Sequence, residues 1–219
     1  MSLYNNIKPV YLHSCDNYDY TEIKKAVENI GNELVNGWDS FIPDNAKVLL
    51  KPNLLMGADP SKAVTTHPLI VKAVAETCKE AGASKVTIGD SPALGSTRKV
   101  AGKAGILSIA EEIGVEINDF SESVKVSTAE GFIHRNFTIA KEVIDADIII
   151  NLPKFKTHAL MVLTLAVKNN YGLFVGKQKM RWHLQSGSNY EYFARLLVEL
   201  AYTIKPKLFF TARVKTISA

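Results

Sequence analysis

Residues 147–158 read DIIINLPKFKTH, and this stretch decides the fold class of the chain. Its first half, Asp147–Leu152, is an almost uninterrupted apolar run of strand length, which is typical of a strand covered on both faces in a parallel sheet. Its second half changes to proline and basic residues. A buried strand that runs into a basic loop indicates the carboxyl edge of an α/β sheet, where such folds bind their ligands.

Strand and helix patterns alternate on both sides of this stretch, with residue Thr21 as the expected cap of the first helix. The interval 124–138 is more polar and alternating, which predicts a hairpin or an edge excursion. The alternation predicts a mostly parallel sheet with helices on both faces. The strands are expected at Val10–Ser14, Ala46–Leu50, Lys85–Gly89, Val115–Phe120 and Leu208–Val214, and the helices at Thr21–Asn36, Pro68–Glu80, Thr97–Gly114 (interrupted at Gly102 and Gly105) and Tyr190–Ile204.

Length and composition fit one globular α/β domain over residues 1–219, because 47% of the residues are hydrophobic and 22% are charged. The start of the chain lacks a signal-peptide pattern, and there is no run of 18 apolar residues, so we expect a cytoplasmic protein with no membrane partner. A net charge of +4 is too mild to make nucleic acid the expected partner. Cys15 and Cys78 lack the spacing of metal or cluster ligands, and we expect two reduced thiols.

The basic residues are unevenly distributed along the chain. The interval 154–181 contains Lys154, Lys156, His158, Lys168, Lys177, Lys179 and Arg181 but no aspartate or glutamate. A surface network of ion pairs would need both signs of charge. The imbalance therefore favours an anionic ligand.

Three predicted strands end in similar loops, and their ends should meet at one edge of a parallel sheet. The loops begin with Lys51-Pro52-Asn53, with Asp90-Ser91-Pro92, and with the segment Pro153–His158. Each loop alone is an ordinary turn, because Pro, Asn, Asp and Ser are common turn residues. Together they supply cations, an amide, a carboxylate and hydroxyls, which favours a binding site.

Two further motifs have both a structural and a functional interpretation. The segment 64–68 (VTTHP) lies at a helix start, where Thr66 or His67 can cap the helix and the free N–H groups can also bind an anion. Lys168 and Gly172 end a short helix and can simply terminate it, or can face a ligand together with Lys177. Phosphate-loop, dinucleotide-binding and GxSxG patterns do not occur in the sequence.

The candidate site residues follow from these loops. Asp90 and His158 are the candidate general acid/base pair. We predict no metal site, with a weak alternative set of His67, Asp90, His158 and His183. The candidate ligand-binding residues are Lys51, Asn53, Thr66, His67, Ser91, Lys154, Lys156, Thr157, Lys168, Asn169 and Lys177.

The segments KPNLL, AVTTHP, IGDSPA, NLPKFKTH and VKNNYGLFVGKQK closely resemble domain of unknown function family 362, over roughly Lys47–His183. The resemblance implies an association with iron-sulfur or ferredoxin-like proteins. The chain departs from the family pattern because it lacks a CxxCxxCxxxC run, so its own cysteines cannot hold a ferredoxin-type cluster. Residues 208–219 (LFFTARVKTISA) also replace a longer family ending, so we expect a truncated member that is incomplete from about residue 205.

Two hypotheses about function follow. In the first, the domain binds an acidic small molecule in redox or cofactor metabolism, and the sequence leaves open whether it also catalyses a reaction. In the second, it is a non-catalytic partner whose basic loops dock an acidic ferredoxin-like redox protein. An iron-sulfur cluster would then belong to longer homologues or to that partner, with no cofactor held by the cysteines of this chain.

Overall fold

The chain folds around a five-stranded parallel sheet in a computed structural model that describes residues 10–15, 17–158 and 161–211. The strand order is β3-β2-β1-β6-β9, and every pairing in this sheet is parallel. The predicted α/β fold class is therefore confirmed. The strands are β1 Lys47–Pro52, β2 Lys85–Asp90, β3 Glu116–Asp119, β6 Ile148–Leu152 and β9 Leu208–Phe209.

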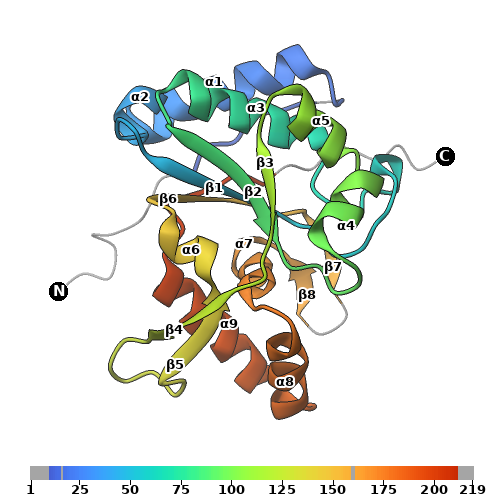
Figure 1. Ribbon diagram of the computed structural model, residues 1–219, viewed down its shortest axis with the longest axis vertical. Helices are drawn as coiled ribbons and strands as arrows, with labels where there is room; N and C mark the ends of the chain where they lie inside the picture. The colour runs from blue at the N-terminus through green and yellow to red at the C-terminus, as the bar shows by residue number, and fades with distance from the viewer. Residues whose placement is uncertain (1–9, 16, 159–160, 212–219) are drawn as a thin grey trace.

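Helices cover both faces of the sheet (Figure 1). One face carries α1 Tyr20–Val35, α2 Trp38–Phe41, α3 Pro68–Glu80, α4 Thr97–Lys103 and α5 Ile106–Glu112. The other face carries α6 Lys141–Asp145, α7 Ala166–Asn169, the 3-10 turn η2 Asn170–Leu173, α8 Lys177–Ser186 and α9 Tyr190–Ile204. A short 3-10 turn, η1 Pro60–Lys62, lies in the loop after β1.

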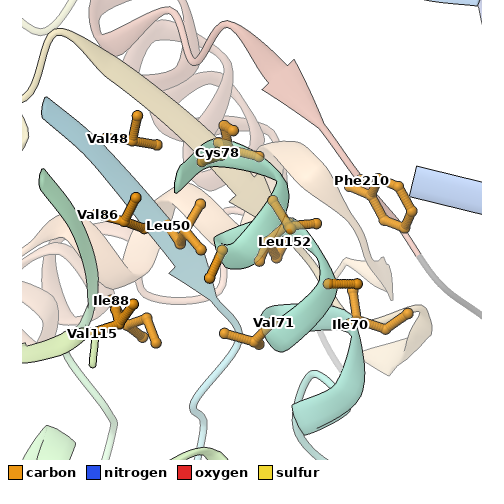
Figure 2. Close-up of a cluster of buried hydrophobic side chains, with 14 of the residues drawn as sticks. Val48, Leu50, Ile70, Val71, Cys78, Val86, Ile88, Val115, Leu152 and Phe210 are labelled. Carbon is orange, nitrogen blue, oxygen red and sulfur yellow. The ribbon is translucent and has the colours of Figure 1, made fainter. Parts of the chain in front are cut away.

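The core is divided between the two faces because successive strand residues point in opposite directions. Val48 and Leu50 of β1 pack against α1 and α3, and Leu49 between them packs under α9. All five residues of β6 are buried, as its apolar run predicts. Figure 2 shows the first of these clusters, in which side chains of β1, β2 and β6 meet α3.

Two antiparallel pairs lie outside the main sheet. Strands β4 Ser123–Ser127 and β5 Asn136–Ala140 form the hairpin expected near 124–138. Strands β7 Lys156–His158 and β8 Val162–Thr164 form a second, shorter pair. The basic segment after β6 is thus partly a strand, where the sequence predicts only a loop.

Several expected boundaries are wrong for identifiable reasons. Residues 10–14 form no strand, because Val10 and Leu12 are more than 80% exposed and pair with no neighbour among the described residues; β9 occupies the edge beside β6. Asp19, and not Thr21, caps α1 by accepting a hydrogen bond from the Glu22 amide. The break after α4 is at Gly105, whose φ of 70° favours glycine, and not at Gly102. The expected strand 208–214 ends at Phe209, and residues 212–214 lie outside the described residues.

Candidate functional site

The carboxyl ends of β1, β2 and β6 bring the candidate residues together. Lys51 pairs in register with Asn151 of β6, and Asp90 is the last residue of β2, the other neighbour of β1. Lys51 and Asp90 are therefore strand residues, although the sequence predicts both in loops. Pro52 fits as the final residue of β1, because a strand end can lack the N–H that a ladder needs.

Lys51 and Asp90 form an ion pair in the interior. The Lys51 Nζ lies 2.8 Å from the Asp90 Oδ1, and the two side chains are 0% and 5% exposed. Asp90 also accepts hydrogen bonds from the backbone N–H groups of Leu54 and Ser91, at 2.8 and 2.9 Å. Burial lowers the pKa of Lys51, and the nearby Asp90 charge opposes this shift. Three donors thus hold the Asp90 side chain in place, which favours a structural anchor over a proton carrier.

Gly172 is needed beside this pair for reasons of space. A Cβ at position 172 would lie 1.9 Å from the Asp90 Oδ1 and 2.6 Å from the Lys51 Nζ. The Gly172 carbonyl also accepts a hydrogen bond from the Ser91 amide at 3.0 Å. The residue that resembles a simple helix terminator in the sequence therefore allows η2 to approach the ion pair.

Four asparagines connect the strand ends to α7. The side-chain Nδ2 of Asn53 donates to the Asn169 Oδ1 at 2.9 Å, and the Nδ2 of Asn169 donates to the Asn151 Oδ1 at 2.7 Å. The Asn151 amide continues the chain to the Asn170 Oδ1 at 2.8 Å. Asn151 and Asn170 were not predicted; the only signals for them are a polar residue inside an apolar strand and the Asn-Asn pair that ends α7.

Three lysines surround this framework with a surplus of positive charge. The Lys156 Nζ donates to the Asn53 Oδ1 at 2.8 Å and to the Val64 carbonyl at 2.6 Å. The Lys168 Nζ lies 4.6 Å from the centre of the Tyr171 ring. Lys179, in the first turn of α8, was not predicted as a site residue and is partly buried like the other two.

The electrostatics of the three lysines reflect their crowding. Burial lowers the pKa of Lys168 to about 8, and the charges of Lys179, Lys51 and Lys156 lower it further. Burial likewise lowers the pKa of Lys156 and of Lys179 to about 8 each. Among the described residues, Asp90 is the one carboxylate that raises the pKa of all three. We call Lys51, Lys156, Lys168 and Lys179 the lysine cluster.

Two histidines border the lysine cluster and are biased towards the neutral form. Burial lowers the pKa of His158, and the charge of Lys168 lowers it further. The same two causes act on His183 in α8. The His158 Nδ1 is 3.1 Å from the Met161 amide and accepts its hydrogen bond, which leaves Nε2 as the proton-bearing nitrogen of the neutral ring.

Lys154 and His67 belong to a separate contact on the α1 side. The Lys154 Nζ donates to the Tyr18 hydroxyl at 3.2 Å, and the His67 and Tyr18 rings stack with centroids 3.5 Å apart. His67 caps α3 through its Nδ1, and burial lowers its pKa to about 4 with a further contribution from Lys154. Lys154 still acts on the lysine cluster, because its charge lowers the pKa of Lys156.

The remaining predicted residues have structural contacts or are exposed. The Thr66 hydroxyl donates a hydrogen bond to the Leu152 carbonyl at 2.6 Å and accepts one from the backbone N–H of Asn53 at 2.8 Å. The half-buried Ser91 lies next to the ion pair, whereas Thr157 and Lys177 are exposed. Within the described residues, no group of three or more His, Cys, Asp or Glu side chains could hold a metal ion.

The two cysteines do not fit a ferredoxin-type cluster, because such a cluster needs four thiolates and the sequence has two. Cys78 is fully buried in α3, which raises its pKa to about 12.

A cavity of about 1160 Å³ lies away from the lysine cluster, between α1 and the segment 201–211. None of the helices in the described ranges is long and apolar enough to cross a bilayer.

Comparison with known proteins identifies three similarities. Residues 48–218 match the family model described as "Domain of unknown function (DUF362)". The thylakoid-associated protein sll1697 from Synechocystis is 37% identical over 202 residues, which is 92% of this chain and 62% of that protein. A crystal structure of a Thermotoga maritima protein has a TM-score of 0.58 at 14% identity, over 92% of this chain and 52% of that one. The chain thus spans 62% of the length of the curated relative, and the Thermotoga structure supports the fold alone.

Proposed function

This chain belongs to the domain of unknown function family DUF362, and we propose that its lysine cluster binds a small acidic molecule with at least two negative charges. The observation that carries the proposal is the charge imbalance at the strand ends. Lys51, Lys156, Lys168 and Lys179 influence one another there, and Asp90 is the single carboxylate among the described residues that opposes them. After Asp90 neutralises one ammonium, the cluster retains an excess of positive charge that an anion can compensate.

The depth of the lysines supports a small ligand over a docked protein. Lys156, Lys168 and Lys179 are each only partly exposed, and Lys51 is fully buried. A folded acidic protein contacts side chains that project from a surface, whereas a small anion can enter between recessed ones. Docking of an acidic ferredoxin-like protein therefore remains the second candidate. The assignment to redox or cofactor metabolism rests on the family resemblance.

The proposal places a proton-transfer group at the edge of the site. His158 is the stronger candidate of the predicted pair, because it is biased towards neutrality at pH 7 and its Nε2 can exchange a proton. Asp90 serves instead to hold Lys51, and through the Leu54 and Ser91 amides it fixes the two loops that follow β1 and β2. Its part in the proposal is positioning.

Titration calorimetry at low salt tests the proposal directly. Phosphate, sulfate and malonate serve as probes, and we expect binding that weakens as ionic strength rises. Lys179→Ala should weaken binding by about tenfold, because a charge-assisted hydrogen bond to a recessed cation is lost. Lys99→Ala, at an exposed lysine of α4, is the matched control and should bind like the wild type.

The opposite result is equally clear. If none of the three anions binds at low salt, or if Lys99→Ala and Lys179→Ala weaken binding equally, the small-anion proposal is wrong. An acidic ferredoxin, titrated against the same two variants, would then test the docking alternative.

A further inference from the structure

The lysines of the site differ in whether the protein itself uses their ammonium groups. Lys51 is bonded to Asp90, Lys156 to Asn53 and Val64, and Lys154 to the Tyr18 hydroxyl. Lys168 and Lys179 have no hydrogen-bond acceptor and no ion-pair partner in the described parts of the chain (10–15, 17–158 and 161–211). Two amines are thus held in the interior of the site without a polar contact to the protein.

Lys168 differs from Lys179 in its surroundings. Its Nζ lies 4.6 Å from the centre of the Tyr171 ring and 5.8 Å from that of Phe193. His183 packs against the same two rings, at 5.0 and 4.9 Å between centroids. The Lys168 ammonium therefore lies close to two aromatic rings and within the electrostatic influence of Lys179, Lys51 and Lys156.

We propose that Lys168 is a nucleophile that forms a protonated imine with a small oxo acid, whose carboxylate is held by Lys179 and Lys156. The proposal rests on the proposed anion site and deepens it by assigning a substrate class and a catalytic residue. An oxo acid supplies both features that the site requires. Its carboxylate matches the excess of cations, and its carbonyl carbon accepts an amine.

The covalent step is balanced without an oxidant or a reductant. The neutral amine of Lys168 adds to the carbonyl carbon, a C–N bond forms, and the carbonyl oxygen takes up a proton to give a carbinolamine. The nitrogen then releases a proton, the hydroxyl receives one and leaves as water, and a C=N bond replaces the C–O bond. Overall, amine, carbonyl and one proton give a protonated imine and water, and a neighbouring ammonium can supply that proton.

The surroundings of Lys168 favour both the attacking amine and the product. Burial and the charges of Lys179, Lys51 and Lys156 lower the pKa of Lys168 to about 8, against the opposing charge of Asp90, so a substantial fraction is neutral near that pH. His158 and His183 also face Lys168, and its charge favours their neutral forms. The protonated imine is again a cation, and the Tyr171 ring stabilises it as it does the ammonium.

Reductive trapping tests the proposal on the wild-type chain. The protein is incubated at pH 8 with glyoxylate or pyruvate and cyanoborohydride, and the modified lysine is identified by peptide mass mapping. We expect Lys168 to be modified at least about tenfold faster than exposed Lys99, because a pKa near 8 leaves roughly half of the amine neutral at that pH. Saturating phosphate should suppress the adduct on Lys168 and leave Lys99 unaffected.

Lys168→Arg separates this proposal from the anion site on which it rests. The variant keeps a positive charge and removes the nucleophile, so we expect no adduct at position 168, and any phosphate binding that it retains reports on the anion site alone. Phosphate binding by the wild type with no adduct, or with the adduct on Lys179, would overturn the imine proposal and leave the anion site standing. If the wild type neither binds phosphate nor forms the adduct, the imine proposal and the anion-site proposal are both wrong.

Discussion

Asp90 and Glu199 are two buried carboxylates in different regions, and their surroundings differ in one respect. Glu199 of α9 accepts hydrogen bonds from the His134 Nδ1 at 2.6 Å, from the Ile133 and His134 amides at 3.1 Å each, and from the Arg195 Nε at 3.2 Å. Asp90 accepts three hydrogen bonds, from the Lys51 Nζ and from the Leu54 and Ser91 backbone amides. In the part of the chain that the structure describes, Asp90 differs in having three further lysines nearby, Lys156, Lys168 and Lys179, on which no second carboxylate acts.

The difference separates a structural polar cluster from a candidate binding site. The Glu199 cluster ties α9 to the loop before β5, and its donors are matched to the oxygens of one carboxylate. At Asp90, the same kind of matched anchor is joined by Lys168 and Lys179, whose desolvation the charge of Asp90 opposes only in part. Such uncompensated charge is costly to a fold, and its retention is expected where a ligand supplies the missing partner.

The largest expected effect is at the anchor itself. Asp90→Ala should lower the free energy of unfolding by about 3–5 kcal/mol, because it leaves the fully buried Lys51 ammonium unpaired. Urea unfolding measures the loss. The double variant Lys51→Met/Asp90→Leu should recover much of it, and a double variant as unstable as the single one would show that the pair does more than neutralise charge.

Gly172→Ala tests how closely η2 must approach the anchor. The added methyl would lie 1.9 Å from the Asp90 Oδ1, and Asp90 cannot move away without breaking its three hydrogen bonds. We expect a loss of about 2–4 kcal/mol in the free energy of unfolding. Gly102→Ala, at a glycine of α4 where an added Cβ would lie 3.7 Å from its nearest neighbour, is the matched control, and an equal loss there would mean that space at position 172 is not the cause.

Glu199→Gln tests the cluster that has no surplus charge. Burial raises the pKa of Glu199, but the hydrogen bonds from His134 and the Ile133 amide outweigh this and lower the net pKa below 4.5. A lowered carboxyl pKa contributes stability that is present above 4.5 and is lost as pH falls through the folded value. We expect the variant to lose about 1–2 kcal/mol at pH 7 and to show a flatter decline in acid. Parallel acid unfolding curves for variant and wild type would contradict the assignment.

Much of the framework of the site follows from the sequence, because it depends on local signals. Apolar runs such as Ile148–Leu152 predict strands, and parallel strands place Lys51 and Asp90 at one edge of the sheet. Two predicted helices are confirmed to the residue, Pro68–Glu80 and Tyr190–Ile204. A proline at the start marks the first, and strong apolar periodicity marks the second. Val10–Ser14 fails as a strand because an apolar run cannot show whether a partner strand lies beside it.

The missing parts of the site depend on contacts between distant segments. Lys179 lies two residues from Lys177 in the sequence, and only the direction of α8 decides which of them faces the lysine cluster and which is exposed. Asn151 is masked by the apolar strand around it, and its two amide hydrogen bonds reach residues 15 and 19 positions away. Asp90 was predicted as an acid or base because the sequence does not reveal that three donors hold it.

The smallest effect concerns the surplus charge and has the opposite sign. Lys168→Met should stabilise the protein at pH 7 by about 1 kcal/mol, because it removes an ammonium that is poorly solvated and close to other cations. In the folded protein, the pKa of Lys168, Lys156 and Lys179 is about 8, below the ordinary value of 10.5. Between these two pH values the unfolded chain binds more protons than the folded protein. The wild type should therefore gain stability as pH rises from about 8 to 10.5. Thermal unfolding across this range should show a weaker rise in the variant. Phosphate should stabilise the wild type more than the variant at pH 7, because the anion replaces the missing partner. A variant less stable than the wild type at pH 7 in the absence of phosphate would mean that the Lys168 stem serves packing and that the lysine cluster resembles the matched cluster at Glu199.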